Sequence, residues 1–449
     1  MSHFLLPTTP LYGHVTPMLT IGRGLRAAGH RVTVLTGRKY RADVEASGLA
    51  FLPLPAAIDY DDADLDDWLP DRHRHRGVAA GRYDIIGMFV RPLPLQHRAL
   101  SDALAAERYD AVLCEAAFLG VLPLLLTHSA GQRIPVVGVS VTPLSVTSVD
   151  CAPFGSGLDP GSSAHTRRRN RFINAVLRSG PLKPIRTSLD AALAEVGAPP
   201  STRSYFDQVT MFDLTFQLAV AGIEYPRREL PGSVRFVGPL RPEVGSDVIL
   251  PRWWGDLDTG RPVVHVTQGT MANADFRQLL LPTLRGLAAE DVLVVASTGR
   301  RPVGDLLSLI GGPPPDNLRV APFLPYASLL PRTHVMVSNG GFGGVQQALS
   351  YGLPLVVAGA SEDKPEVAAR VAWAGAGVNL RTGAPSPAQV RRGVRRVLRE
   401  GRFRQGARRL QDEIARQPDP VTVIVETLEQ LVALPVRPTP LATSLGTKH

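Results

Sequence analysis

The amino-acid sequence predicts an α/β protein with two doubly wound, Rossmann-like domains that face each other across a cleft. Three observations lead to this fold class. The first forty residues alternate strand, helix and strand, a second alternation starts near Pro262, and a segment rich in proline and glycine separates the two. We therefore expect a first domain at residues 1–235, a linker at 236–261, a second domain at 262–418, a C-terminal helix at 419–434 and a disordered tail at 435–449.

The N-terminal unit is consistent with a strand, a helix and a second strand. Apolar residues predict strands at 3–6 and 31–35. Between them, Thr16 is placed to cap a helix, and Pro17 suits the first helical position, where no backbone donor is needed. Gly29 would end this helix in the left-handed conformation that glycine adopts at little cost. Residues 11–15 are then expected to form a loop after the first strand.

The remainder of the first half carries two more strands and two irregular segments. Short apolar runs at 111–114 and 136–139 predict strands of a parallel sheet with helices on both faces. Residues 59–98 combine an acidic run, a His/Arg cluster and an apolar patch, which we interpret as a surface excursion. Glycine, serine, proline and arginine predominate at 143–180, which predicts a long mobile loop.

The second half repeats the strand and helix alternation. Its expected strands are residues 263–266, 292–296, 334–337 and 355–357, and its expected helices are residues 277–287, the segment after Gly344, and residues 366–374.

Composition is that of a folded intracellular protein. Hydrophobic residues make up 44% and charged residues 20% of the 449-residue chain. Apolar runs fall far short of the ~20 residues that span a bilayer, and no cationic leader with a cleavage site opens the chain. Cys114 and Cys151 are too few for a disulfide framework, so a reducing cytoplasm is the expected location.

The net charge of +9 is concentrated in two arginine-rich stretches, residues 167–171 and 391–409. In the second, Val394, Val397 and Leu398 recur at helical spacing, which predicts an amphipathic helix with a solvated arginine face. We expect no nucleic-acid partner, and weak attraction to an anionic membrane surface is the alternative. The sequence does not indicate an oligomeric state.

Two residues in the first half point to acid–base chemistry. His14 follows the first strand, and in an open α/β sheet the loops at the carboxyl ends of strands face the ligand crevice. A histidine there can accept a proton from an attacking hydroxyl group, although a surface histidine is an equal alternative. Glu115 follows the strand at 111–114 and could orient His14 and stabilise its imidazolium, with a solvated or capping carboxylate as the alternative.

A glycine-rich segment in the second half predicts a diphosphate site. Gly340, Gly341, Gly343 and Gly344 follow the strand at 334–337 and precede a helix. Glycines let the backbone approach a ligand, and a helix start offers unpaired N–H groups with a positive dipole end. Gln347 lies further along and could bind ribose hydroxyls.

These motifs give the whole chain a resemblance to the nucleotide-sugar-dependent glycosyltransferases of the GT-B fold, in the branch of natural-product, macrolide and plant secondary-metabolite transferases. Residues 13–17 resemble the catalytic-base motif of that family, with Glu115 where an aspartate is usual. Residues 339–365 resemble its donor-binding signature. The resemblance implies that the first domain binds the acceptor and the second binds the donor.

The resemblance also implies individual donor contacts. Gly269 and Thr270 would contact the diphosphate, Phe323 and Leu324 would flank the nucleobase, and Asp363 would bind sugar hydroxyls. Phe323 has an equal alternative as a core aromatic residue. The remaining donor-binding residues of the signature are Asn339, Gly340, Gly341, Phe342, Gly343, Gly344, Gln347 and Lys364.

Four of these positions depart from the family pattern. Asn339 replaces a histidine, Gly344 a hydroxyl residue, Gln347 a glutamate and Lys364 a glutamine. Each change weakens or alters a donor contact, while the backbone amides and the helix dipole remain. The departures leave the nucleotide, uridine or thymidine, and the sugar open.

The expected function is an inverting transfer of a sugar from a UDP- or dTDP-sugar to a small, largely apolar acceptor, with no cofactor and no metal ion. The acidic run at 59–67 and the cluster of His73 and His75 lack the ligand pattern of a calcium or zinc site. Two alternatives are a nucleotide-sugar epimerase of the same fold and a catalytically silent nucleotide-sugar binding helper protein. Candidate acceptor contacts, each of which could equally belong to the core, are Tyr12, Met88, Phe89, Phe118 and Leu119.

Overall fold

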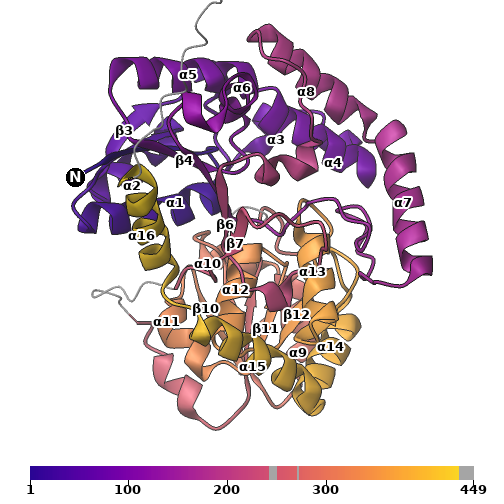
Figure 1. The fold of residues 1–449 in the computed structure, drawn as a ribbon. Helices are drawn as coiled ribbons and strands as arrows, with labels where there is room; N and C mark the ends of the chain where they lie inside the picture. Colours follow the sequence, from indigo (N-terminus) through magenta and orange to yellow (C-terminus); the bar gives the residue numbers. More distant parts are fainter. Residues whose placement is uncertain (242–249, 270–272, 434–449) are drawn as a thin grey trace, which may run out of the picture.

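The computed structural model describes residues 1–241, 250–269 and 273–433. They form two lobes, each built around one parallel sheet (Figure 1). The first sheet has the strand order β3-β2-β1-β4-β5-β6-β7, and the second has the order β10-β9-β8-β11-β12-β13. This arrangement confirms the predicted fold class. The expected tail at 435–449 and part of the expected linker lie outside the described residues.

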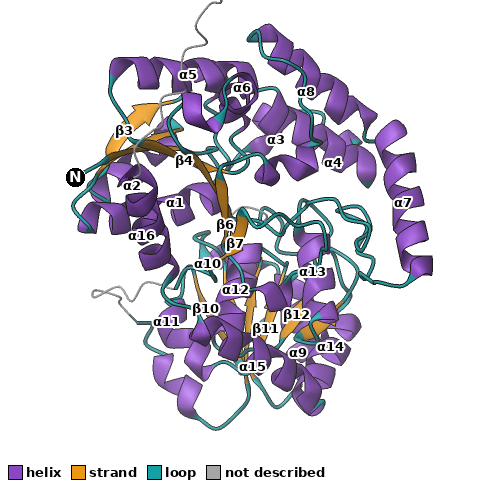
Figure 2. Ribbon diagram, viewed as in Figure 1, coloured by secondary structure: helices purple, strands orange, loops and turns teal. Residues whose placement is uncertain are grey.

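Helices cover both faces of the first sheet (Figure 2). Its strands are β1 (His3–Pro7), β2 (Arg31–Thr36), β3 (Ala50–Pro53), β4 (Ala111–Glu115), β5 (Val136–Ser140), β6 (Leu214–Gln217) and β7 (Val234–Phe236). The helices of this lobe are α1 (Tyr12–Ala27), α2 (Arg41–Ala46), α3 (Leu65–Trp68), α4 (Val78–Ile85), α5 (Leu93–Ala106), α6 (Leu122–Thr127), α7 (Ala164–Ser179) and α8 (Lys183–Glu195), with a π-helical turn at Ile86–Val90.

The second lobe repeats this architecture. Its strands are β8 (Val263–Thr267), β9 (Leu293–Ser297), β10 (Leu318–Ala321), β11 (Val335–Ser338), β12 (Leu355–Val357) and β13 (Gly377–Asn379). Its helices are α9 (Leu280–Leu287), α10 (Val303–Ser308), α11 (Tyr326–Leu329), α12 (Phe342–Ser350), α13 (Lys364–Trp373), α14 (Pro387–Arg399) and α15 (Gly401–Arg416), and α16 (Pro420–Ala433) follows. None of the helices in the described part of the chain is long and apolar enough to cross a membrane.

The strands are apolar throughout because both faces of each sheet are buried. In β1, Phe4 packs on the face that is covered by α1 and α16, whereas the next residue, Leu5, packs in the core on the opposite face. Alternate residues of a strand point to opposite faces, so a strand buried on both sides has no polar alternation. This is the pattern that the apolar runs predicted.

The last helix, α16, returns to the first lobe and lies against α1 (Figure 1). Ile424 and Leu428 of α16 complete the core cluster beneath β1. A Cβ atom at Gly24 would lie 2.1 Å from Val421 Cγ1, so the two helices approach this closely because residue 24 is glycine. The C-terminal helix thus connects the second lobe to the first.

Helix α1 begins at Tyr12, four residues before the predicted cap at Thr16, and this prediction was wrong. The missing cap is supplied from far along the chain, because Asp62 Oδ2 accepts a hydrogen bond of 2.7 Å from the backbone N–H of Tyr12. His14 therefore lies in the first turn of a helix rather than in a loop. Gly29, with a φ of 88°, follows the helix as expected.

Two further expectations need correction. Much of the segment at 143–180, predicted as a mobile loop, is the four-turn helix α7, whose N-cap Ser163 accepts a hydrogen bond from Thr166 N. Buried Asn170 holds α7 to the preceding segment by donating to Val149 O at 3.0 Å. The arginine-rich stretch at 391–409 is two amphipathic helices, α14 and α15, separated at Glu400.

Candidate functional site

The predicted site residues lie where each sheet reverses its strand order. In the first sheet β1 lies between β2 and β4, and in the second β8 lies between β9 and β11. At such switch points the loops after adjacent strands diverge to opposite faces and leave a crevice for a ligand. His14 and Glu115 follow β1 and β4, while Gly269 and Asn339 follow β8 and β11.

In the first lobe the structure brings His14 and Glu115 into contact. His14 Nδ1 lies 3.0 Å from Glu115 Oε1, and the Glu115 side chain is only 1% exposed. The same oxygen accepts a hydrogen bond of 2.8 Å from the backbone N–H of Ala117, which fixes the carboxylate. A carboxylate beside Nδ1 favours the tautomer with its proton on that atom, so Nε2 is left as the proton acceptor.

The electrostatic surroundings tune His14 toward the imidazolium. Burial alone would lower its pKa, but the Glu115 carboxylate, with smaller contributions from Asp363 and Asp62, raises the pKa of His14 above its ordinary value of 6.5. Such an imidazole can take up a proton and be stabilised in the charged form by Glu115.

Asp62 belongs to this site although sequence reasoning assigned it to a solvated acidic loop. Its side chain is 2% exposed, caps α1 through Tyr12 N and pairs with Lys39 Nζ at 2.5 Å. Tyr60 and Leu69 of the same excursion are buried with Met88 and Leu11. Part of the segment at 59–98 is therefore a packed support for the start of α1, whereas much of residues 61–82 is exposed, as expected of a surface excursion.

Asp363 of the second lobe influences the charge state of His14 in the first lobe. It occupies the N-cap position of α13 without a side-chain capping hydrogen bond, and burial raises the pKa of Asp363 while Lys364 and the His14 imidazole oppose that rise. His14 and Asp363 thus lie within electrostatic range of each other across the cleft. The residue that the resemblance assigns to donor sugar hydroxyls is therefore on the side of the second lobe that faces the candidate base.

The glycine-rich segment forms an open helix start. Gly341 is the N-cap of α12 and offers no side-chain cap, so the first N–H groups of the helix are available to a ligand. A Cβ atom at Gly343 would meet nothing within 4 Å, whereas Gly340 and Gly269 adopt φ values of 91° and 73°. Phe342 is buried in the core beneath them. These features fit a diphosphate cradle.

Two of the four departures from the family pattern, Asn339 and Lys364, make internal contacts. Asn339 Nδ2 donates to Gln268 O and ties the loop after β11 to the loop after β8. Lys364 is buried and pairs with Glu362, which also accepts a hydrogen bond of 3.3 Å from Arg72 of the first lobe. Gln347 is half-buried, and a Cβ atom at Gly344 would lie 3.8 Å from Met336 Cε. Thr270 lies outside the described residues.

The predicted nucleobase contacts differ in exposure. The Phe323 ring is 58% exposed, whereas Leu324 is 1% exposed in a core cluster and can act only through its backbone or as support. Arg300 places its guanidinium 5.6 Å from the Phe323 ring centroid and 5.4 Å from that of Tyr12 in the other lobe. Tyr12 and Phe323 therefore face one cation from opposite sides of the cleft.

Four of the five predicted acceptor residues divide into one neighbour of His14 and three core residues, and the fifth, Tyr12, lies against Arg300. The Phe89 ring centroid lies 6.2 Å from that of His14. The side chains of Met88, Phe118 and Leu119 are 5%, 0% and 1% exposed and belong to hydrophobic clusters. The core alternative that the sequence left open describes their position.

A cavity of about 330 Å³ opens in the first lobe beyond Phe89. Tyr205, one of its lining residues, lies 6.3 Å from Phe89 between ring centroids, so three rings lead from His14 to the cavity. Burial raises the pKa of Tyr205, and the negative charge of Glu115 adds to this rise. Other lining residues are Ser145, Thr147, Ala152, Pro153, Phe154, Arg178, Arg203 and Phe206.

Sequence reasoning missed Tyr205, Asp62 and Arg300. The adjacent aromatic pair Tyr205 and Phe206, in a segment without helical or strand periodicity, was a usable signal for a binding surface. No local pattern marks Asp62 or Arg300, because their partners are distant in sequence.

Comparisons with known proteins agree with this geometry. The C-terminal domain of erythromycin biosynthesis protein CIII-like proteins matches residues 283–431. The chain is 40% identical to 4'-demethylrebeccamycin synthase from Lentzea aerocolonigenes over 95% of this chain and 99% of that protein. It is 34% identical to UDP-glycosyltransferase 2 from Phaeomoniella chlamydospora, with 96% of each chain covered.

A solved structure shares the fold. The glycosyltransferase VinC, in a crystal structure with dTDP, matches with a TM-score of 0.64 at 20% identity and covers 96% of this chain and 99% of its own. The two-lobed architecture is therefore the architecture of that protein as well.

Proposed function

Because this chain belongs to the natural-product branch of the UDP-glycosyltransferase family and is a glycosyltransferase, we propose that it moves a sugar from a UDP- or dTDP-sugar to a hydroxyl group of a small, largely apolar acceptor with inversion at the anomeric carbon. The observation that carries the proposal is the His14–Glu115 pair, with 3.0 Å between Nδ1 and Oε1, within electrostatic range of Asp363 of the opposite lobe.

The proposed reaction is a single displacement. The acceptor hydroxyl gives its proton to His14 Nε2 while its oxygen forms a bond to the anomeric carbon. The bond from that carbon to the β-phosphate oxygen breaks, and its electron pair leaves with the nucleotide diphosphate. Glu115 stabilises the imidazolium that forms.

The departing diphosphate is assigned to the start of α12. The unpaired amides after Gly341 and the helix dipole lie where negative charge develops on the leaving group. Asp363 is assigned to the sugar hydroxyls and Phe323 to the nucleobase. The rings of Phe89 and Tyr205, which extend from His14, and the cavity beyond them are assigned to the acceptor. These surfaces suit an aromatic or otherwise apolar aglycone.

Both uridine and thymidine have support as the nucleotide of the donor. The relative from Phaeomoniella chlamydospora is named a UDP-glycosyltransferase, and VinC is seen with dTDP. The epimerase and the silent helper protein are not favoured, because neither uses the His14–Glu115 pair.

A direct test follows both the fate of the donor and the anomeric configuration of the product. The wild-type protein is incubated with UDP-glucose or dTDP-glucose, both α-linked, and the planar phenol umbelliferone, and the anomeric proton of the product is observed by NMR. A β-linked product supports the proposal. An α-linked product contradicts inversion, and epimerised donor without transfer would establish the epimerase instead.

A further inference from the structure

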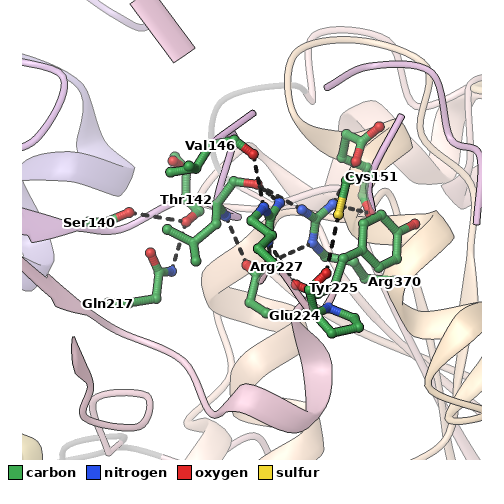
Figure 3. Close-up of polar contacts among 12 residues, drawn as sticks. Ser140, Thr142, Val146, Cys151, Gln217, Glu224, Tyr225, Arg227 and Arg370 are labelled. Atoms are coloured by element: carbon green, nitrogen blue, oxygen red, sulfur yellow. Dashed lines mark hydrogen bonds and ion pairs between the residues drawn. The ribbon is translucent and has the colours of Figure 1, made fainter. Parts of the chain in front are cut away.

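A fully buried ionic cluster joins the lobes away from the reacting groups. Arg370 of α13 is 1% exposed and donates from Nε to Glu224 Oε2 at 2.9 Å and from Nη1 to Glu366 Oε2 at 2.6 Å. Figure 3 shows Arg370 against Tyr225, beside Glu224 and Arg227. Burying such a cluster gives little net stability compared with apolar packing, so a positional role needs to be sought.

Both backbone polar groups of Leu144 end in this cluster. Its carbonyl accepts a hydrogen bond of 2.8 Å from Arg370 Nη2, and its N–H donates to Glu224 Oε1 at 2.8 Å. Leu144 follows β5 of the first lobe, whereas Arg370 belongs to the second. One end of the segment between β5 and α7 is therefore held by a helix of the opposite lobe.

The same helix holds that segment a second time. Glu366 Oε1 accepts hydrogen bonds of 2.8 Å from Gly155 N and 3.1 Å from Gly157 N. Both glycines adopt positive φ, 91° and 60°, in a turn that presents two amides to one carboxylate oxygen. Glu366 is 3% exposed, so these are charge-assisted bonds to a buried carboxylate.

The residues between the two anchors form one wall of the cavity. Ser145, Thr147 and Phe154 all line it. The middle of the wall is tied to the first lobe, because Ser145 Oγ donates to Phe206 O and Thr147 N donates to Asp207 Oδ1. The cavity is thus closed on one side by a segment whose two ends contact α13. The end at Leu144 is also held by Arg227, which donates to Leu144 O at 2.6 Å and to Val146 O at 2.9 Å.

Helix α13 begins directly after Asp363, the residue assigned to the donor sugar. We propose that Arg370 and Glu366 are positioning residues through which the donor-binding lobe sets the wall of the acceptor cavity. This inference rests on the proposed function in assigning the cavity to the acceptor. It makes acceptor affinity, rather than donor affinity, depend on a pair of residues in the donor-binding lobe.

The test compares Glu366→Gln with the matched control Glu413→Gln. Glu413 of α15 also accepts a hydrogen bond from a glycine across the lobes, Gly222 N at 3.0 Å, but does not touch the wall. We expect Glu366→Gln to raise the KM for umbelliferone about 10-fold or more, the effect of losing a charge-assisted hydrogen bond, with donor KM within about twofold. Glu413→Gln should leave both KM values unchanged.

Hydrogen exchange provides a readout that needs no substrate. Amides at 144–157 should exchange faster in Glu366→Gln and at the wild-type rate in Glu413→Gln. If Glu366→Gln does not fold, Gly157→Ala replaces it. This exposed position, with φ of 60°, can be perturbed without opening the core and should give the same selective change.

Unchanged wall exchange in the folded variant overturns the inference, as does faster exchange with an unchanged acceptor KM or with equal increases in both KM values. Failure of the wild type to transfer sugar from either donor would instead count against the proposed function, and the exchange comparison would still decide whether α13 holds the wall.

Discussion

Replacing Glu115 with glutamine should separate the charge of this residue from its shape. The Glu115→Gln side chain is isosteric, and its one remaining oxygen can still accept from Ala117 N and lie next to His14 Nδ1. The negative charge beside the imidazole is lost. Because Glu115 is 1% exposed, water cannot replace that charge.

The distance sets the scale of the effect. At 3.0 Å and an effective dielectric constant of about 20, two unit charges attract by roughly 5–6 kcal/mol, which is an upper limit for the stabilisation of the imidazolium. Loss of the orienting carboxylate in comparable histidine pairs lowers turnover by about 10²- to 10⁴-fold, or roughly 3–5 kcal/mol. We expect kcat/KM to fall within that range.

The pH dependence of kcat/KM gives a second expectation, with a defined direction. Glu115 raises the pKa of His14, and the base form is populated above that pKa, so wild-type kcat/KM should rise with pH through a value above 6.5. In Glu115→Gln the pKa of His14 falls, and the acidic limb should move to lower pH while the plateau drops.

The assay is transfer from UDP-glucose or dTDP-glucose, whichever is the better donor, to umbelliferone across a pH series. The control is Glu429→Gln, which removes the partner of another histidine, His30, at 2.9 Å and far from the cleft. That variant should keep the wild-type profile. A Glu115→Gln enzyme with an unmoved acidic limb, or with wild-type kcat/KM, would refute the reasoning.

Three substitutions test the donor side. Phe323→Ala should raise donor KM by about 5- to 150-fold, the loss of one base-stacking contact, and should leave Tm unchanged because Phe323 is 58% exposed. The control Phe172→Ala, at a position 70% exposed on α7, should change neither donor KM nor Tm. Equal donor KM values for the two variants would remove Phe323 from the nucleobase site. Gly340→Ala should lower stability by about 1–3 kcal/mol, because its φ is 91° and a Cβ would lie 3.0 Å from Val357 Cγ1; an unchanged thermal melt would contradict this. Gly343→Ala, which meets no atom within 4 Å, should raise donor KM at unchanged Tm, and a donor KM equal to that of the wild type would show that the diphosphate does not approach this backbone.

The fold could be predicted because its signals are local. Apolar runs mark strands buried on both faces, such as β1 and β8, and glycine marks helix ends, such as Gly29. His14 and Glu115 could be paired from sequence because adjacent parallel strands bring their carboxyl ends to one edge of the sheet.

The parts that sequence did not reveal depend on contacts between distant residues. The start of α1 is set by Asp62, which lies fifty positions away in the sequence, so the residues near Thr16 give no indication of it. Helix α7 looked like a loop because its arginines give little apolar periodicity, while its anchor is the single buried Asn170. The anchoring of the cavity wall by Arg370 likewise joins residues more than two hundred positions apart.

The most direct test of the account is the His14→Ala variant measured for transfer and for donor binding in parallel. We predict that kcat for umbelliferone falls by at least about 10²-fold, while the thermal shift produced by UDP or dTDP stays at the wild-type value, because the role proposed for His14 is to accept the acceptor proton and not to bind the diphosphate. Near-normal turnover in His14→Ala would contradict the central claim, whatever the donor.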